Sequence, residues 1–290
     1  MSKLPFVDTH IHLWDLTDPQ LAYAWLAPDW VHPILGDIDA IKVSHWEAEH
    51  QRFETLHANV SKVVHVQAAI GIEDPVEETR WLEAAAERTG WPDAIVAYAD
   101  LTSPDVEAEL ERHMEASARM RGIRDFGWAA CEDDAAYARG TAALAKHDLM
   151  LGIDTTWEEA DRVLALARAA SETPIVIDHA AFPRERTDEY FESWKRGMRR
   201  VAEADNMYMK ISGLGMCDND WTADSWRPWA LACVEIFGVE RCVLGTNWPV
   251  DKLYSTYEAV VDAYEEIFAG FSQDDQVALF SGNAERLFRI

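Results

Sequence analysis

The chain contains 290 residues, 49% of them hydrophobic, which is enough to bury the core of one large α/β domain. The 52 acidic and 26 basic residues give a net charge of −26, which argues against nucleic acids and anionic membranes as partners, because their phosphates attract basic surfaces. A small anionic substrate remains compatible with this charge, since a few cations in a cleft attract it more strongly than the distant acidic residues of the surface repel it.

Several features of the chain predict a cytoplasmic protein. The first strand is predicted at Pro5–Asp15, which leaves no room for a signal peptide before it. No apolar run is long enough to span a membrane. The cysteines show no CxxC spacing and are predicted to be reduced thiols, at Cys131, Cys217, Cys233 and Cys242.

Strand-like and helix-like segments alternate along the chain. The predicted strands are Pro5–Asp15, Val63–Ala69, Ile95–Leu101, Gly122–Trp128, Met150–Thr155, Pro174–His179, Met207–Ser212 and Cys242–Thr246. The predicted helices are the amphipathic stretches Pro75–Thr89, Pro104–Ala118, Ala135–His147, Trp157–Ser171, Glu185–Ala204 and Trp226–Phe237. Repeated β-α units of this size predict a parallel sheet closed into a (β/α)8 TIM barrel, with one domain over residues 1–290.

The connection between the first two strands is much longer than the others. A helix fits near Trp46–Asn59, but Leu16–Ser44 is predicted to be an irregular loop. Long loops within compact domains are usually functional, and a loop that follows a barrel strand lies on the face where active sites sit. We therefore expect a flap on the substrate side, with a packed surface excursion as the alternative.

Two histidines end the first strand. Side chains alternate in a strand, so Phe6, Asp8, His10 and His12 are predicted to share one face. Two imidazoles in this arrangement can converge on one metal ion or one substrate atom. The alternative is an edge strand with two solvated histidines.

Polar residues also end other predicted strands. His179 is the last residue of the sixth strand, and a histidine at the C-terminal tip of a barrel strand favours a catalytic role. Asn247 follows the eighth strand. On the second strand, Gln67 lies nearer the C-terminal end and is the better pocket candidate, whereas His65 is predicted to be a hydrogen-bonded core histidine.

Two cations lie within apolar strands, Arg124 in the fourth and Lys210 in the seventh. Such a position is costly unless the cation meets an anion, which is either a substrate group or a structural carboxylate. The 13 tryptophans likewise fit either core packing or an aromatic pocket wall. Trp248, beside Asn247, is counted with Gln67, Arg124 and Lys210 as a candidate substrate contact.

Six motifs together resemble the amidohydrolase-related lactonases, a group that includes 2-pyrone-4,6-dicarboxylate lactonase and sugar-acid lactonases such as fuconolactonase. The motifs are Val7–Asp15, Gly122–Arg124, Asp178–His179, Lys210–Leu214, Gly245–Pro249 and Gly282–Phe288. The resemblance implies a (β/α)8 barrel that hydrolyses a small ester, most often a lactone. It also implies that His10, His12 and His179 are active-site histidines and that Arg124 contacts a substrate carboxylate.

The sequence departs from that family pattern at two places. The family usually has an aspartate at the tip of the eighth strand as general base, whereas Asn247 cannot take a proton near neutral pH. Asp251, in the same loop, and His179 are the alternative bases. Metal-dependent members of the wider superfamily add a histidine from the fifth strand, whose end here, Gly152–Thr156, contains no histidine. A divalent ion, zinc or manganese, on His10, His12 and His179 therefore stays open beside metal-free catalysis.

The sequence-based expectation is a hydrolase that opens a sugar-acid or carboxylated lactone with activated water at the C-terminal face of the barrel. The first alternative is a metal-dependent decarboxylase or amidohydrolase on the same barrel, and the second is a non-catalytic small-molecule binding protein. The expected partner is a small molecule, and a homo-oligomer is left open.

Overall fold

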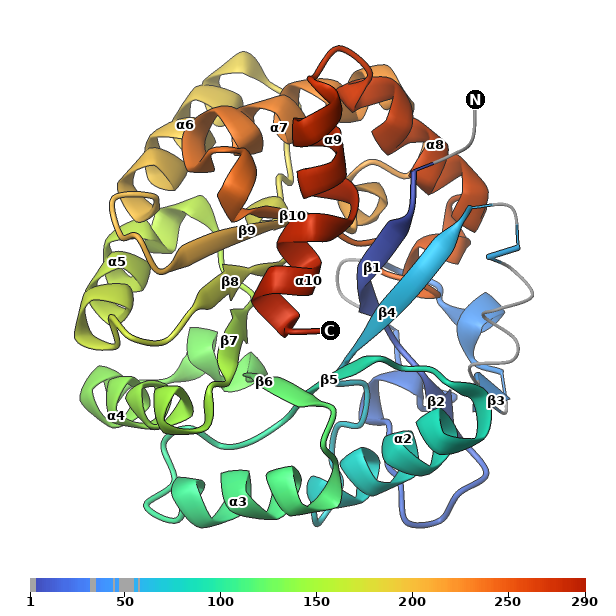
Figure 1. The fold of residues 1–290 in the computed structure, drawn as a ribbon, viewed down its shortest axis with the longest axis vertical. Helices are drawn as coiled ribbons and strands as arrows, with labels where there is room; N and C mark the ends of the chain where they lie inside the picture. The colour runs from blue at the N-terminus through green and yellow to red at the C-terminus, as the bar shows by residue number, and fades with distance from the viewer. Residues whose placement is uncertain (1–3, 32–34, 44, 47–54, 57) are drawn as a thin grey trace.

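The computed structural model describes residues 4–31, 35–43, 45–46, 55–56 and 58–290. Within these residues, eight parallel strands pair side by side in the order β1-β4-β5-β6-β7-β8-β9-β10. Figure 1 shows them around a common axis with the helices outside, which confirms the predicted (β/α)8 barrel. Their bounds are β1 Phe6–Ile11, β4 Val60–Val66, β5 Ala94–Ala97, β6 Met120–Arg124, β7 Met150–Ile153, β8 Ile175–Ile177, β9 Met207–Ile211 and β10 Cys242–Leu244.

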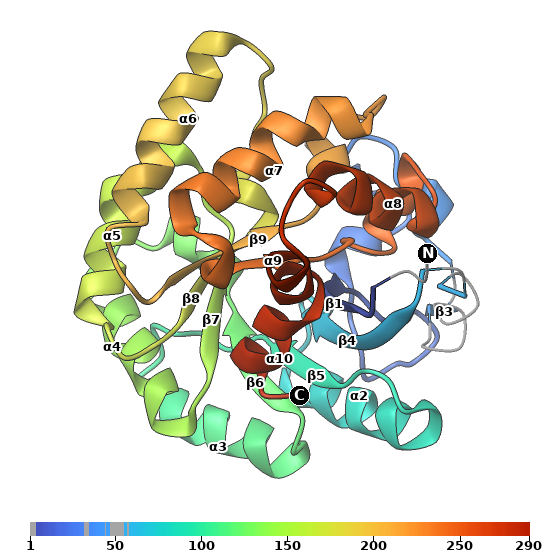
Figure 2. The same cartoon turned by 45° about the horizontal axis from the view of Figure 1, so that its top comes forward.

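Amphipathic helices follow one another around the outside of the barrel (Figure 2). Three of them, α6, α7 and α8, begin after threonines whose hydroxyls accept a backbone N–H of the first turn. In the described residues, no helix is long and apolar enough to cross a membrane. The helix bounds are α2 Val76–Thr89, α3 Val106–Ala116, α4 Asp134–Leu144, α5 Ala160–Ala169, α6 Asp188–Val201, α7 Ala223–Phe237, α8 Tyr257–Phe268, α9 Gln273–Val277 and α10 Asn283–Phe288.

Two apolar layers form the core. One lies between the strands and the surrounding helices. The other fills the barrel and joins valines of the strands to α10, with Val7, Val64, Val66, Val96, Val176, Val243, Leu287 and Phe288 among its members. Figure 1 looks onto the barrel end across which α10 lies. Since α10 covers the N-terminal ends of the strands, side chains at their C-terminal ends are left to form a site.

Polar side chains link the first and last strands of the barrel. Thr9 donates its hydroxyl to the Leu244 carbonyl at 2.7 Å. The buried Asp8 carboxylate accepts from the Thr246 amide at 2.9 Å and from the Tyr257 hydroxyl of α8 at 2.8 Å. The prediction that Asp8 shares the face of the two histidines is therefore wrong. The physical reason is a register shift in β1 between Asp8 and Ile11, which interrupts the strand alternation.

The segment between β1 and β4 contains short elements. They are β2 Trp14–Asp15, η1 Ala24–Leu26, η2 Asp39–Ile41 and β3 His45–Trp46, and β2 pairs with β3 in a two-stranded antiparallel sheet. A single irregular loop over Leu16–Ser44 is therefore not confirmed. The helix predicted near Trp46–Asn59 falls largely on residues outside the described ranges, although Trp46 itself belongs to β3.

Candidate active site

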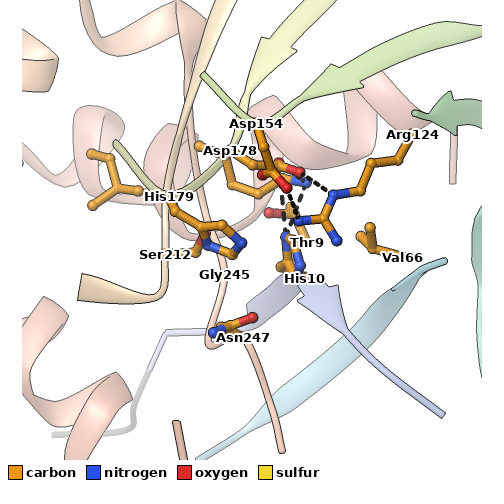
Figure 3. A network of polar contacts seen from close by, with 12 residues as sticks. Thr9, His10, Val66, Arg124, Asp154, Asp178, His179, Ser212, Gly245 and Asn247 are labelled. Carbon is orange, nitrogen blue, oxygen red and sulfur yellow. Dashed lines mark hydrogen bonds and ion pairs between the residues drawn. The ribbon is translucent and has the colours of Figure 1, made fainter. Parts of the chain in front are cut away.

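Four charged side chains meet inside the barrel near the C-terminal ends of β6 to β9, three of them buried and the fourth, Asp154, partly exposed. Lys210 Nζ lies 2.8 Å from Asp178 Oδ1, and Arg124 Nε lies 3.2 Å from Asp178 Oδ2. Arg124 Nη2 also donates to Asp154 Oδ2 at 2.7 Å, and Figure 3 shows these contacts as a connected network. Both cations thus already have a carboxylate partner within the protein.

The two carboxylates of this network differ in their electrostatics. Burial alone would raise the pKa of Asp178, but Lys210, His10 and Arg124 together hold it well below its usual value. Burial raises the pKa of Asp154, and the neighbouring Arg124 only partly opposes this effect. Asp178 is therefore the permanent anion of the network, and Asp154 is the more weakly stabilised one.

His10 and His12 converge as the sequence predicts, with their Nε2 atoms 3.2 Å apart. His12 Nδ1 lies 2.8 Å from the Val66 carbonyl oxygen, which can only accept, so Nδ1 carries the proton and Nε2 carries a lone pair. Burial lowers the pKa of both imidazoles well below the usual value, and Lys210 adds to this at His10, as Arg124 does at His12. Both rings are therefore neutral at physiological pH.

His179 reaches the site by a different route from the one that strand alternation predicts. It begins a run of four residues in the left-handed region, with φ values of 56°, 50°, 57° and 48° for His179, Ala180, Ala181 and Phe182. Strand alternation placed His179 with Ile175 and Ile177, which face the outer core. The left-handed turn brings the imidazole back towards the barrel axis, where its Nδ1 lies 3.0 Å from Ser212 Oγ.

Contacts from α6 hold this left-handed turn. Trp194 Nε1 donates to the Ala180 carbonyl at 2.9 Å, and the turn closes with Phe182 N donating to His179 O at 2.9 Å. Burial lowers the pKa of His179 to about 3, despite the opposing effect of Asp178. This ring is therefore also neutral at neutral pH, and its unprotonated nitrogen can accept a hydrogen bond.

Asn247 at the pocket wall forms a buried pair with Asp251 behind it. Asn247 Nδ2 donates to Asp251 Oδ2 at 2.7 Å, so the amide oxygen of Asn247 remains as its acceptor end. Asp251 is fully buried, and this burial raises its pKa to about 7 despite the hydrogen bonds from Asn247 and Gly215. The Asp251 carboxylate thus reaches the site only through Asn247.

A pocket of about 470 Å³ opens above these residues. Five predicted site residues line it: His12, Gln67, Arg124, His179 and Asn247. Trp25, Trp30 and Leu35, from the segment between β1 and β4, line it as well, as do Phe126, Asp154, Thr155, Thr156, Glu159, Phe182 and Arg184. The aromatic members support the expectation of an aromatic pocket wall.

Four other predicted residues lie behind the pocket lining. His10 is fully buried beside His12, and the Lys210 ammonium is occupied by Asp178, as the structural alternative for Lys210 requires. Asp251 lies behind Asn247. The Trp248 indole is buried against Tyr257, with ring centroids 5.4 Å apart, so Trp248 serves the site through its carbonyl, which accepts from His12 N at 2.7 Å.

Sequence reasoning did not select two carboxylates, Asp154 and Asp178. Each continues the inward face of its strand, two residues after Gly152 on β7 and after Val176 on β8. The alternation of inward and outward residues could have identified both. Asp154 was not selected because the family pattern predicts a histidine at the end of β7. Asp178 was not selected because the catalytic role was assigned to the histidine that follows it.

Several buried donor atoms lie close enough together to hold a divalent cation. His10, His179 and Asp178 each offer a donor atom within 4.8 Å of the other two. Two nitrogens on one tetrahedral zinc ion, each at 2.0–2.1 Å, lie about 3.3 Å apart, which matches the 3.2 Å between His10 Nε2 and His12 Nε2. His12 also has the outer-shell carbonyl partner that orients metal-binding imidazoles. Two overlapping sets therefore fit such an ion: the pair His10 and His12 by its nitrogen spacing, and the cluster of His10, Asp178 and His179 by its proximity.

Comparisons with known proteins agree with this architecture. The sequence matches the amidohydrolase family over residues 7–290. An uncharacterized protein of Sinorhizobium fredii is 34% identical over 303 residues and covers 100% of both chains. The L-fucono-1,5-lactonase of Burkholderia ambifaria is 29% identical, covering 98% of this chain and 95% of the relative.

Among solved structures, a zinc-bound amidohydrolase from Burkholderia multivorans has the same fold, with a TM-score of 0.82 at 23% identity and 99% of both chains covered. The family match extends over nearly the whole chain and includes every strand of the barrel. The chain therefore belongs to the amidohydrolase family, is a hydrolase, and is related to the lactonases of that family.

Proposed function

We propose that the protein opens a small lactone by adding water at the C-terminal end of the barrel. The observation that carries this proposal is the group of neutral imidazoles of His12 and His179 in a pocket of about 470 Å³, beside the Arg124 guanidinium. The similarity to L-fucono-1,5-lactonases from two Burkholderia species supports the same reaction class. Family membership among hydrolases argues against the non-catalytic alternative.

The pocket residues have distinct roles in this reaction. The lactone carbonyl lies against His12, and the Arg124 Nη1 group, which has no partner among the described residues, donates to the oxyanion that forms there. The Asn247 amide oxygen accepts from the attacking water and orients it. His179 takes the proton from this water, and the growing negative charge beside it raises its basicity as the C–O bond forms.

The products then follow from proton balance. The tetrahedral intermediate collapses, the ring C–O bond breaks, and the proton held by His179 passes to the departing ring oxygen. The new carboxylic acid ionises and releases one proton to solution. A divalent ion held by His10 and His12 would polarise the carbonyl and make bound water more acidic. Lys210 and Asp178 keep His10 in place from below.

Hydrolysis of a lactone panel, followed with a pH indicator, tests the proposal. The purified protein is assayed as isolated, after chelation, and with added zinc or manganese. We expect ring opening of at least one 1,5- or 1,4-lactone. Failure to open any lactone in all four conditions, together with release of CO₂ from an aromatic acid, would instead support the decarboxylase alternative.

A further inference from the structure

Aromatic side chains from the segments after the strands lie directly against polar side chains of the pocket. The Phe126 ring, after β6, covers the Arg124 guanidinium, with the guanidinium carbon 4.2 Å from the ring centroid. The Phe182 ring, after β8, meets the His179 imidazole edge to face, with ring centroids 5.1 Å apart. Both phenylalanines line the pocket. Groups proposed to act on a lactone carbonyl therefore have apolar rings as neighbours within the pocket.

The Trp25 indole extends this apolar wall. Its ring centroid lies 6.2 Å from that of the His12 imidazole, and its Nε1 donates to the Ala68 carbonyl at 2.8 Å. Because its one N–H group is used inside the protein, the indole has only carbon atoms to offer a ligand. Further apolar lining comes from five residues of other segments: Trp30, Leu35, Ile70, Met216 and Val250.

A ligand in the pocket can reach the three rings. Phe126 is 42% exposed and is the one exposed aromatic side chain among those whose exposure the structure describes. Trp25 and Phe182 are half-buried. A single exposed aromatic residue is common on protein surfaces, but this ring lines a concave pocket and already has the Arg124 guanidinium against it. A ligand that displaces water from such apolar surface gains binding energy.

The size of the pocket leaves room for more than a lactone ring. Its volume of about 470 Å³ lies in the range of pockets that enclose drug-sized ligands, whereas an unsubstituted lactone is much smaller. Two charged residues also line it, but Glu159 is paired with Arg162 at 3.2 Å, and Arg184 is exposed. The space beside the polar groups is therefore bounded mainly by apolar side chains.

We infer that Trp25, Phe126 and Phe182 form an apolar subsite, so that the preferred lactone carries a phenyl ring or a branched alkyl group. This inference rests on the proposed lactone hydrolysis and names the substrate class within it. A hydroxyl on that substituent would lose its hydrogen bonds to water, and the three rings offer no oxygen or free N–H in exchange. Lactones with an apolar substituent should therefore be favoured over those with a hydroxylated or carboxylated one.

The kinetic test compares δ-valerolactone with its phenyl-substituted derivative, each rate constant being divided by that of the hydroxide-catalysed reaction. In the wild type, kcat/KM should be about 10-fold or more higher for the phenyl lactone, the usual discrimination from burying an apolar group. In Phe126→Ala this preference should fall to about threefold or less. The control is Met114→Ala, which shortens an exposed apolar side chain of α3 outside the pocket and should leave the preference unchanged. No preference in the wild type, or an unchanged one in Phe126→Ala, would overturn the inference.

A second variant separates the subsite from a role of Phe126 through Arg124. Phe126→Leu keeps an apolar side chain but removes the aromatic face that covers the guanidinium. The preference for the phenyl lactone should be at least about twofold larger in Phe126→Leu than in Phe126→Ala. Equal losses on both lactones in both variants would overturn the inference, because they would show that the ring acts through Arg124 alone.

A binding measurement on the wild type separates this inference from the proposed reaction. Calorimetry with piperidin-2-one and its phenyl derivative, unreactive analogues of the two lactones, should show about 10-fold tighter binding of the phenyl lactam and a more negative heat-capacity change. If the wild type binds in this way but opens no lactone, the reaction fails and the inference stands. If the phenyl lactam binds no more tightly than the parent, or does not bind, the inference fails whatever the reaction is.

Two further lactams test the polarity of the subsite. Derivatives that carry a hydroxymethyl group or a carboxylate in place of the phenyl ring should bind more weakly than the phenyl lactam. Tighter binding of the hydroxymethyl lactam would overturn the inference. Tighter binding of the carboxylated lactam would also overturn it, and would indicate that Arg184 binds the substituent instead.

Discussion

Neutral imidazoles close to buried cations characterise this site at the scale of single residues. His10, His12 and His179 all have a lowered pKa, because burial and the nearby Lys210 or Arg124 disfavour a further positive charge. Each ring therefore has a lone pair available over the whole physiological pH range. The same lone pairs suit a metal ion, a proton acceptor or a hydrogen bond from water.

The first prediction concerns the histidine pair of β1. Replacing both His10 and His12 by alanine should lower kcat by about 100-fold or more, since groups that stabilise the developing oxyanion typically contribute this much. The protein should stay folded, because the pair lies at the strand tip and not among the valines that fill the barrel. Steady-state kinetics and circular dichroism provide the measurements, with His147→Ala as the control. A folded double variant with near-wild-type kcat would refute the assignment of the site.

The second prediction separates the two candidate bases. Because Asp251 reaches the pocket only through Asn247, Asp251→Asn should retain most of kcat, whereas His179→Asn should lose about 100-fold. The opposite ranking would make Asp251 the base and leave His179 as a ligand or hydrogen-bond donor.

The raised pKa of Asp251 also predicts how this substitution changes the pH dependence of stability. Its folded-state pKa of about 7 exceeds the unfolded value, so the folded protein holds a proton that the unfolded chain releases between about pH 4 and 7. In this range the contribution of Asp251 to stability falls with rising pH, by about 1.4 kcal/mol per pH unit. Asp251→Asn should therefore stabilise the protein more at pH 8 than at pH 5, as measured by urea unfolding at both pH values.

At the scale of elements, the geometry of the site depends more on the backbone at the ends of the strands than on the strands themselves. The left-handed turn from His179 to Phe182 follows β8 and turns an outward position inward. Left-handed conformations cost L-residues roughly 1–2 kcal/mol each, so the contacts from Trp194 and the burial of the turn must offset this strain. The arrangement is typical of strain that a functional position retains.

The third prediction tests this strain through glycine. Ala181→Gly removes a buried methyl group, worth roughly 0.8 kcal/mol, but it also relieves the left-handed strain, so stability should stay within about 0.5 kcal/mol of the wild type or rise. Ala165→Gly, at an exposed position of helix α5, should lose about 1 kcal/mol instead. Urea unfolding of both variants gives the comparison. A larger loss at Ala181 than at Ala165 would contradict the strain argument.

The limits of sequence-based prediction also lie at this scale. Periodicity located the barrel strands to within a few residues, because each strand has apolar neighbours on both faces. It failed for the orientation of Asp8 and for the route by which His179 enters the site, because a register shift and a left-handed turn break the alternation without changing the pattern of residue types. Alternation does place Asp154 on the inward face of its strand, but its pairing with Arg124 from the neighbouring strand β6 cannot be read from the pattern of one strand.

At the scale of the whole molecule, the chain is strongly acidic, whereas the charged side chains at the bottom of the pocket are paired. The chain has a net charge of −26, yet the bottom of the pocket pairs the cations Arg124 and Lys210 with Asp154 and Asp178. The charges of these four side chains therefore balance at the bottom of the pocket. In the proposed lactone opening, the anionic product would meet carboxylates there and a net negative surface outside, which would favour its release.

The two ends of the barrel are expected to have different roles: the end covered by α10 contributes to stability, and the end with the pocket carries the activity. The last prediction tests this difference. Phe288 of α10 is fully buried and packs in the layer of strand valines. The helix α10 lies across the end of the barrel that faces the viewer in Figure 1. Phe288→Ala should destabilise the protein by about 3–5 kcal/mol, because it leaves a cavity that the barrel cannot close. Below the transition temperature, kcat should remain within about twofold of the wild type, since Phe288 is not among the pocket residues and lies at the other end of the barrel. The control is Arg286→Ala, which removes an exposed side chain paired with Glu240 and should cost less than about 1 kcal/mol. Urea unfolding and initial rates on the same preparations measure both quantities. A large fall in kcat in folded Phe288→Ala would show that the two ends of the barrel are coupled.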